Sequence, residues 1–386
     1  MRLVYGAPHF IEKLMIKICI ITSAHPPFDI RIFYKEAKSL VRAGYDLTLI
    51  AQYDREEIVD GIRIINLQRP RNRIERMTNT VWSAFRKALE VDADIYHFHD
   101  PDLIPLGMLL KMLGHKVIYD VHEDVPRQTL NKHYLPWIIR KPIAWAISVL
   151  EWFGAKVFNA VIPATPKIAE RFPTHKTVVV QNFPIVAELI TFQTIPYDQR
   201  ALSFTYVGDI STIRGAVEMI HAFEFLNGIS GVRLELAGEF SPSSLEDELR
   251  ALPMWALVNY HGQVSRARVS QIIGGVRAGL VLFHPLPNHI DAQPNKMFEY
   301  MSAGLPIIVS DFPLWRRIVN SVGCGLLVDP LNPRAVAEAM RWILDHPAEA
   351  EVMGQRGRKA VEQIYNWGVE SVKLIELYKK LSDTPT

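Results

Sequence analysis

Several classes of protein are excluded by what this 386-residue sequence lacks. It has only two cysteines, one in each half, so there is no disulfide framework and a reducing compartment is expected. Its longest apolar run, residues 143–150, is far shorter than the roughly 20 residues that span a bilayer. The net charge of +2 argues against the concentrated basic face typical of nucleic-acid binding. A Gly-x-Gly-x-x-Gly fingerprint is also absent, which counts against a nicotinamide-dependent enzyme.

The N-terminal region does not have the layout of a secretory signal. Its apolar residues 18–21 are typical of a strand and lead into a proline-rich turn, and residues 1–14 precede them as an extension. We therefore expect a cytoplasmic protein, which could lie at the inner face of the cytoplasmic membrane.

Predicted strands and helices alternate throughout the chain, which indicates an α/β protein with parallel sheets covered on both faces. The strands expected in the first half are 16–22, 47–51, 62–66, 95–98, 116–120, 160–163 and 177–180. Those expected in the second half are 203–207, 233–237, 257–261, 279–283, 306–310 and 325–328. Residues 184–200 are irregular and contain two prolines, so we interpret them as a linker between domains at 15–183 and 201–367.

The most informative segment is 291–319, DAQPNKMFEYMSAGLPIIVSDFPLWRRIV. Pro294 and Asn295 open a short helix that precedes a buried strand. Lys296 and Glu299 share one face of this helix because residues three apart are neighbours. The free N–H groups of a helix start attract anions, and Lys296 strengthens that field. A carboxylate one turn further in could accept hydrogen bonds from sugar hydroxyls, so the segment suits a sugar nucleotide.

This segment resembles the donor-binding segment of family 4 glycosyltransferases, which are retaining enzymes with the GT-B fold. In that family an acidic residue, seven intervening residues and a Glu lie against the donor, and here these positions are Asp291 and Glu299. Most members have Glu at the first position. The resemblance implies that Glu299 binds the ribose hydroxyls and that Asp291 acts near the transferred sugar.

The resemblance also implies an architecture. Two Rossmann-like, doubly wound domains would face a cleft, with the acceptor side in the first domain and the nucleotide sugar in the second. A C-terminal helix at 368–382 would cross back and pack on the N-terminal domain.

A second motif, YVGDISTIRG, follows the strand predicted at 203–207. Family members often have Arg directly after the Gly and Lys five residues later, both reaching the donor diphosphate. This sequence has Gly208 followed by Asp209, and Arg214 at the second place. Arg214 can hold phosphate oxygens in a bidentate manner, and we expect Lys296 to replace the missing cation.

Histidines end two predicted strands of the first half. By resemblance, His122 in YDVHED aligns with the active-site His near donor sugar and acceptor. The segment HFHDPD places His97 and His99 on one face of a strand. Two histidines and two aspartates so close could suggest a metal, but no third or fourth ligand has a recognised spacing. We therefore predict no metal site and assign His99 a structural or acceptor-side role.

Asp29 and Arg31 follow the first predicted strand in SAHPPFDIR, where many relatives have a glycine-rich loop. They could bind the acceptor or simply cap the following helix, and both interpretations stay open.

The segment 134–158 contains three tryptophans together with Arg140, Lys141 and Lys156. Its aromatic side could lie on a membrane with the basic residues at the lipid headgroups. The alternative is a buried helix of the core.

We thus predict a retaining glycosyltransferase of the hexosyl-transferring type, acting in surface polysaccharide or glycolipid assembly. It would use a nucleotide-diphosphate sugar and a saccharide or lipid-linked acceptor, without cofactor, metal or nucleic acid. The second half has no Asp-x-Asp motif, consistent with metal independence. Two alternatives are a GT-B-like sugar-nucleotide epimerase and a catalytically inactive scaffold, which the departures at Asp209 and Asp291 keep open.

Overall fold

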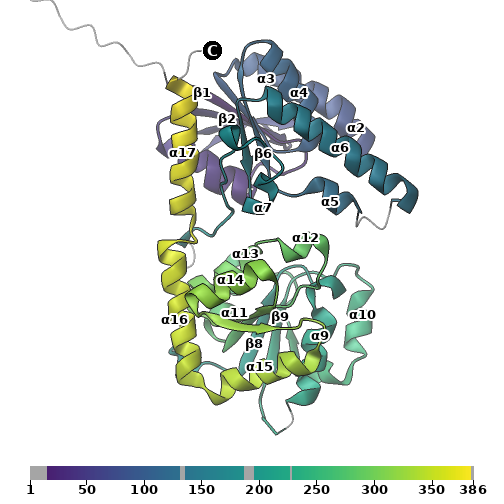
Figure 1. Cartoon of the computed structure of the whole chain (residues 1–386), viewed down its shortest axis with the longest axis vertical. Coiled ribbons are helices and arrows are strands. Elements are labelled where there is room, and N and C mark those ends of the chain that lie inside the picture. Colours follow the sequence, from purple (N-terminus) through teal and green to yellow (C-terminus); the bar gives the residue numbers. More distant parts are fainter. Residues whose placement is uncertain (1–14, 131–134, 187–194, 227, 384–386) are drawn as a thin grey trace, which may run out of the picture. The chain divides into compact units, whose positions relative to one another are not determined.

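The computed structural model describes residues 15–130, 135–186, 195–226 and 228–383, which form two compact units (Figure 1). The first unit comprises the described residues of 15–126, 135–180 and 371–383, and the second those of 127–130 and 181–370. The predicted extension at 1–14, Tyr134 and residues 187–194 of the predicted linker lie outside the described residues.

The first unit contains a seven-stranded sheet with the order β3-β4-β2-β1-β5-β6-β7. Its pairs are parallel except at the edge, where the unpredicted β3 runs antiparallel to β4. The strands are β1 (Lys17–Ile21), β2 (Asp46–Gln52), β3 (Glu57–Val59), β4 (Ile62–Leu67), β5 (Ile95–Phe98), β6 (Lys116–Val121) and β7 (Ala160–Pro163).

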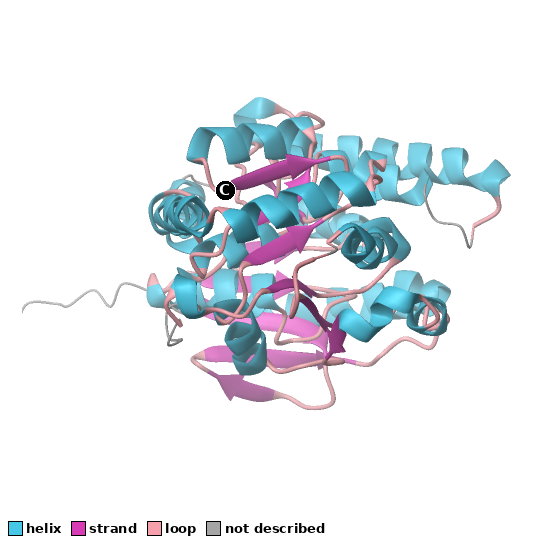
Figure 2. Ribbon diagram, turned by 90° about the horizontal axis from the view of Figure 1, so that it is seen from below, coloured by secondary structure: helices cyan, strands magenta, loops and turns pink. Residues whose placement is uncertain are grey.

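Helices flank the strands on both sides, as the cyan ribbons around the magenta arrows in Figure 2 show. Those that precede the second sheet are η1 (Ile30–Ala37), α1 (Lys38–Arg42), α2 (Arg73–Glu75), η2 (Arg76–Thr80), α3 (Val81–Val91), η3 (Pro101–Leu103), α4 (Ile104–Met112), α5 (Val125–Leu130), α6 (Trp137–Val157), α7 (Pro166–Ala169) and η4 (Thr174–Lys176). The helix expected after the first strand begins as the π-helix η1 and continues as α1.

The strand predicted at 177–180 is wrong as a separate element. Thr177 forms only an isolated bridge with Val161, next to β7. The N–H groups of Val178 and Val180 donate to carbonyl groups of β7, at 3.0 and 3.2 Å. The apolar pattern therefore marks a segment that lies along the sheet edge without completing a ladder.

The second unit contains a six-stranded parallel sheet with the order β10-β9-β8-β11-β12-β13. Its strands are β8 (Ser203–Val207), β9 (Arg233–Ala237), β10 (Val258–Tyr260), β11 (Ala278–Val281), β12 (Ile307–Ser310) and β13 (Gly325–Val328). Its helices are η5 (Tyr197–Gln199), η6 (Thr212–Arg214), α9 (Ala216–His221), η7 (Ala222–Phe225), α10 (Leu245–Arg250), η8 (Pro253–Leu257), α11 (Arg266–Gly274), α12 (Pro287–Ile290), α13 (Asn295–Ser302), α14 (Pro313–Val322), α15 (Pro333–Asp345) and α16 (Pro347–Gln363).

Each sheet has a point where the strand order reverses. In the first unit β1 lies between β2 and β5, and in the second unit β8 lies between β9 and β11. The loop after β1 or β8 leads to one side of the sheet order, and the loop after its neighbour β5 or β11 leads to the other side, so the two loops diverge at the carboxyl ends of these strands. Residues that follow β1, β5, β8 and β11 are therefore the ones that the fold exposes for binding.

Close packing holds α13 against the second sheet. A Cβ atom on Gly279 of β11 would lie 2.2 Å from the Tyr300 ring of α13, so only glycine fits there. The Val207 N–H at the end of β8 donates to the Tyr300 hydroxyl at 2.9 Å. These two contacts of Tyr300 hold α13 against β11 and the end of β8.

The last helix, α17 (Trp367–Asp383), contributes residues from Ser371 onward to the first unit. Its Tyr378 is fully buried, and the hydroxyl lies 2.8 Å from Nδ1 of His97. Within the described residues, none of the helices combines the length and the apolar character that crossing a membrane requires.

Candidate active site

The loop after β8 begins with a glycine that the geometry requires. Gly208 has a φ of 122°, in the region that favours glycine, and a Cβ atom there would lie 3.0 Å from Nζ of Lys296. Gly215, with a φ of 79°, begins α9 after the single turn of η6. The loop backbone thus passes directly against the Lys296 ammonium group.

Lys296 lies in the first turn of α13, with its ammonium group enclosed by aromatic rings. Nζ donates to the Tyr206 hydroxyl at 2.7 Å and lies 3.8 Å from the centre of that ring and 5.3 Å from that of Phe283. Burial lowers the pKa of Lys296 well below its ordinary value, and the charge of Arg214 lowers it further, whereas Glu299 and Asp209 raise it. An anion bound here would supply the counter-charge that this cation lacks.

Arg214, at the end of η6, supplies the second cation. Its Nη1 lies 3.0 Å from Oδ2 of Asp209, and the guanidinium lies 5.7 Å from the ring centre of Phe283. The Asp209 side chain is 53% exposed, so this ion pair is solvated and weak. Asp209 therefore neutralises Arg214 in part.

Glu299 follows Lys296 by one helical turn, as the sequence indicates. Its Oε1 lies 3.3 Å from Nη1 of Arg266 on α11, and its side chain is 20% exposed. Asn295 begins α13 directly after the extended Pro294. Gly208, Arg214, Lys296, Asn295 and Glu299 thus belong to one region of the second unit.

Asp291 lies apart from these contacts, just after α12. Its carboxylate is 3.3 Å from Nη1 of Arg127, a residue that groups with the second unit. The turn between α12 and α13 is held by Trp315, whose Nε1 donates to the Ala292 carbonyl at 2.7 Å.

Three aromatic residues of this region were not predicted: Tyr206, Phe283 and Tyr300. Their contacts depend on which residues of β8, β11 and α13 lie opposite one another, and the sequence does not specify this register. The only signal is the position of Tyr206 and Phe283 at the ends of their predicted strands.

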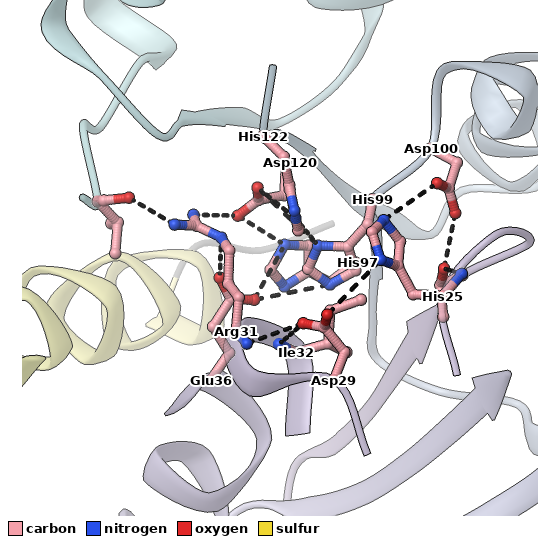
Figure 3. Close-up of polar contacts among 12 residues, drawn as sticks. His25, Asp29, Arg31, Ile32, Glu36, His97, His99, Asp100, Asp120 and His122 are labelled. Atoms are coloured by element: carbon pink, nitrogen blue, oxygen red, sulfur yellow. Dashed lines mark hydrogen bonds and ion pairs between the residues drawn. The ribbon is translucent and has the colours of Figure 1, made fainter. Parts of the chain in front are cut away.

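A group of polar side chains in the first unit forms a buried network at the carboxyl ends of β5 and β6 (Figure 3). Arg31 lies at its centre, where Nη2 is 2.8 Å from Oδ2 of Asp120 and Nε is 2.8 Å from Oε1 of Glu36. The side chains of Arg31, Glu36 and Asp120 are at most 3% exposed. Arg31 Nη1 also donates to the Val180 carbonyl at 3.0 Å.

Two carboxylates share this one guanidinium, and their pKa values separate. Burial and the neighbouring Asp120 raise the pKa of Glu36, despite Arg31. Burial opposes ionisation of Asp120 too, but Arg31 and His122 bring its pKa well below the usual range. Neither Glu36 nor Asp120 was predicted as a site residue. Glu36 is far in sequence from every histidine of the network, and Asp120 is next but one to His122 but far in sequence from His97.

The predicted His122 joins this network through its ring. Its Nε2 lies 3.0 Å from Oδ1 of Asp120 and 2.6 Å from Nδ1 of His99. His122 is 18% exposed, whereas His97 and His99 are buried. Burial lowers the pKa of both His97 and His99, which favours neutral imidazoles. Of these three rings, His122 is the one that a substrate can reach.

Asp29 caps the helix that follows β1. Its Oδ1 accepts hydrogen bonds from the N–H groups of Arg31 and Ile32, at 2.8 and 3.0 Å. Burial raises the pKa of Asp29, but the nearby His25, at 3.6 Å, and the hydrogen bond from the Ile32 N–H bring it down to about 2. The structure therefore places Asp29 as a cap and Arg31 in the buried network.

Residues 191–360 match the family described as glycosyl transferases group 1, and residues 31–183 match glycosyltransferase family 4. The sucrose-phosphate synthase of Thermosynechococcus elongatus superimposes with a TM-score of 0.74 at 19% identity, covering 95% of this chain and 99% of that one. Anabaena HepE in complex with UDP-glucose gives a TM-score of 0.70 at 12% identity, covering 96% and 100%.

Curated relatives are also glycosyltransferases. The MMP α-(1→4)-mannosyltransferase of Mycolicibacterium hassiacum is 19% identical over 296 residues, 73% of this chain and 70% of that protein. The D-inositol 3-phosphate glycosyltransferase of Kineococcus radiotolerans is 28% identical over 163 residues, 40% of this chain and 35% of that protein.

Two α/β units built on parallel sheets define the GT-B class of glycosyltransferase, and this prediction of the sequence is confirmed. With its two halves matching the two family descriptions, the chain belongs to the group 1, family 4 glycosyltransferases. It is accordingly a glycosyl-transferring enzyme.

The lowered pKa of Lys296 predicts how donor binding depends on pH. The protonated ammonium attracts a diphosphate, and it loses its proton at lower pH than an ordinary lysine does. Affinity for a nucleoside diphosphate should therefore fall as pH rises from about 7 to about 10, a range in which the phosphate charge is constant. Calorimetric titration of the full chain across this range measures the change.

Lys296→Arg is the matched control, because a guanidinium stays charged throughout this range. Its affinity should change with pH much less than that of the parent. Equal pH profiles for the parent and Lys296→Arg would contradict the role of Lys296 as the titrating cation.

Proposed function

We propose that the protein transfers a sugar from a nucleotide-diphosphate donor to a hydroxyl acceptor with retention of anomeric configuration. The observation that carries this proposal is the pair of cations, Lys296 and Arg214, beside the Gly208 loop. The Lys296 ammonium group packs against Tyr206, and no carboxylate of the described residues is in direct contact with it. Such a cation suits a site that binds a diphosphate. The HepE structure, whose complex contains UDP-glucose, supports a nucleotide sugar as donor.

The chemistry follows from where charge develops. As the bond between sugar and diphosphate breaks, negative charge grows on the leaving phosphate, and Lys296 and Arg214 stabilise it. The N–H groups at Asn295 add the field of the helix start. Glu299 accepts hydrogen bonds from the ribose, and Asp291 acts near the transferred sugar. His122 supplies an imidazole or carbonyl acceptor for a sugar hydroxyl.

The acceptor side belongs to the first unit in this proposal. Asp29 lies at the surface edge of the buried network, whereas Arg31 and His99 are buried and would act on the acceptor by positioning His122. The acceptor is a saccharide or a lipid-linked saccharide, consistent with surface polysaccharide or glycolipid assembly. Analysis of the products distinguishes this transfer from epimerisation of the nucleotide sugar.

Glu299→Ala tests the donor site. The variant loses the acceptor for the ribose hydroxyls but keeps a good helix former in α13. A hydrogen bond to a charged group is worth about 1.5–3 kcal/mol, so affinity for the nucleoside diphosphate should fall about tenfold to a hundredfold. Calorimetry gives the affinity, with Glu338→Ala, at an exposed position of α15, as the control.

Two variants of Asp291 accompany this test. Asp291→Asn should lower turnover more than nucleotide binding, and Asp291→Glu should keep activity. If Glu299→Ala binds the nucleotide as tightly as the parent, α13 is not the donor helix.

We also propose that transfer is independent of added metal, because two cations stand where a metal would otherwise neutralise the diphosphate. Activity should persist in excess chelator during the assay, and magnesium or manganese should not raise it. Loss of transfer on addition of chelator, with recovery on adding magnesium, would count against this site.

A membrane contact through α6 is the third part of the proposal. Ile138, Trp145, Val149 and Trp152 of this helix are 66%, 70%, 43% and 52% exposed. Spacings of three or four residues put them on one face, together with the exposed Lys141 and Lys156. An apolar stripe with aromatic rings and lysines suits the interface of an anionic bilayer.

Vesicles test this contact. The full chain should co-sediment with vesicles rich in phosphatidylserine and dissociate in high salt. Each lysine near an anionic surface contributes about 1 kcal/mol, so Lys141→Glu combined with Lys156→Glu should weaken binding by at least about tenfold. The matched control reverses Lys379 and Lys380, which are exposed on α17. If both double variants co-sediment with vesicles equally, or if the parent does not co-sediment at all, α6 does not bind lipid through these lysines.

A further inference from the structure

Four buried side chains of the first unit direct ligand atoms toward one point. They are Glu36 of η1, His97 of β5, His99 just after it, and Asp120 of β6, and each is at most 3% exposed. One nitrogen or carboxylate oxygen from each lies within 4.8 Å of all the others. Figure 3 shows these four groups around the same small volume.

Each of the two imidazoles is held by a polar contact at its Nδ1, on the side away from the cluster. Nδ1 of His97 lies 2.8 Å from the Tyr378 hydroxyl, and Nδ1 of His99 lies 2.6 Å from Nε2 of His122. With each Nδ1 bonded, each Nε2 faces the cluster. Metal-bound histidines commonly have their second nitrogen hydrogen-bonded in this way, because the bond orients the ring and fixes its tautomer.

An independent observation is that the inward-facing atoms have no hydrogen-bond partner. This holds for Nε2 of His97, Nε2 of His99 and Oε2 of Glu36, all of which are buried. Buried polar atoms almost always have a partner, because leaving one unsatisfied is costly. Three such atoms converging on one point call for a ligand.

Two separations of 3.6 Å suit a shared ion better than a direct hydrogen bond, whereas a third, at 4.0 Å, is wider than either and would have to shorten on binding an ion. Glu36 Oε2 lies 3.6 Å from Nε2 of His99 and 4.0 Å from Nε2 of His97, while Nε2 of His97 lies 3.6 Å from Oδ2 of Asp120. Hydrogen bonds between nitrogen and oxygen span about 2.7–3.2 Å. Ligands placed tetrahedrally at about 2.0–2.2 Å from a metal are about 3.3–3.6 Å apart.

The charges of the cluster also favour a bound cation. Glu36 and Asp120 supply two carboxylates, while Arg31 supplies one positive charge within the cluster. Arg31 binds Oε1 of Glu36 and leaves Oε2 to the cluster, but it shares Oδ2 of Asp120 with His97. A buried carboxylate needs a compensating cation or a proton.

We propose that Glu36, His97, His99 and Asp120 bind one divalent transition metal of the zinc type. Four protein ligands, with no position left for water or substrate, are typical of a structural zinc site rather than a catalytic one. Such an ion would fasten η1, β5 and β6 together and, through His99, set the orientation of His122. This departs from the prediction of no metal, which considered only the histidines and aspartates close together in sequence. The proposal is independent of the proposed function.

Metal analysis of the full chain, purified without a polyhistidine tag, tests the proposal. Elemental analysis should find about one zinc per chain. Glu36→Gln and His97→Gln should each reduce the content at least about tenfold, and His175→Gln, at an exposed histidine, should not change it. Metal content unaffected by the two ligand variants would overturn the assignment.

A second measurement uses only the parent chain, so it does not depend on how the variants fold. The protein is unfolded in chelator and refolded with zinc, with magnesium or with neither. Zinc alone should raise the melting temperature and restore the metal content. A metal-free parent whose melting temperature is the same under all three conditions would show that protons hold the cluster together. Metal content is also measured before and after the transfer assay in chelator. Loss of zinc in that assay marks an effect on this site, whereas loss of transfer with the zinc retained marks an effect on the donor site.

Discussion

Both polar clusters depend on one constraint, the reversal of strand order in a parallel sheet. In the first unit the residues after β1, β5 and β6 meet, and in the second unit the loops after β8 and β11 do the same. The loops that follow these strands lead to opposite sides, which leaves a crevice at the carboxyl ends where side chains can meet one another or a ligand. Alternating strands and helices thus create two places at which charged residues can gather, one in each unit.

The two clusters resolve buried charge in different ways. In the second unit Lys296 is enclosed by Tyr206 and Phe283, and burial lowers the pKa of this cation more than Glu299 and Asp209 raise it. In the proposed function, a diphosphate supplies the counter-charge that this cation lacks. In the first unit Arg31 meets two carboxyl groups within the same network, so one of them needs a proton or a second cation. One cluster therefore suits an anionic substrate and the other a cation held permanently.

The sequence predicted much of this arrangement. Apolar segments located both parallel sheets, because strands buried on both faces are nearly continuous in apolar residues. The segment around Lys296 and Glu299 could be interpreted because helix spacing alone relates those residues. The contact of Lys296 with Tyr206 could not be predicted, since it depends on the packing of α13 across β8. The meeting of Glu36 and Asp120 with His97 likewise depends on the register between β5, β6 and η1. The edge strand β3 was missed because three residues are too few to show alternation.

We propose that the second unit holds the diphosphate of a nucleotide sugar at the loop after β8 and the start of α13. Hydrogen–deuterium exchange of the full chain, with and without saturating UDP, GDP or ADP, tests it most directly. We expect at least one nucleotide to slow exchange at residues 208–215 and 295–302 and to leave exchange in the strands of the first sheet unchanged. Binding of a nucleotide that slows exchange only elsewhere, or no binding of any of the three, would contradict it.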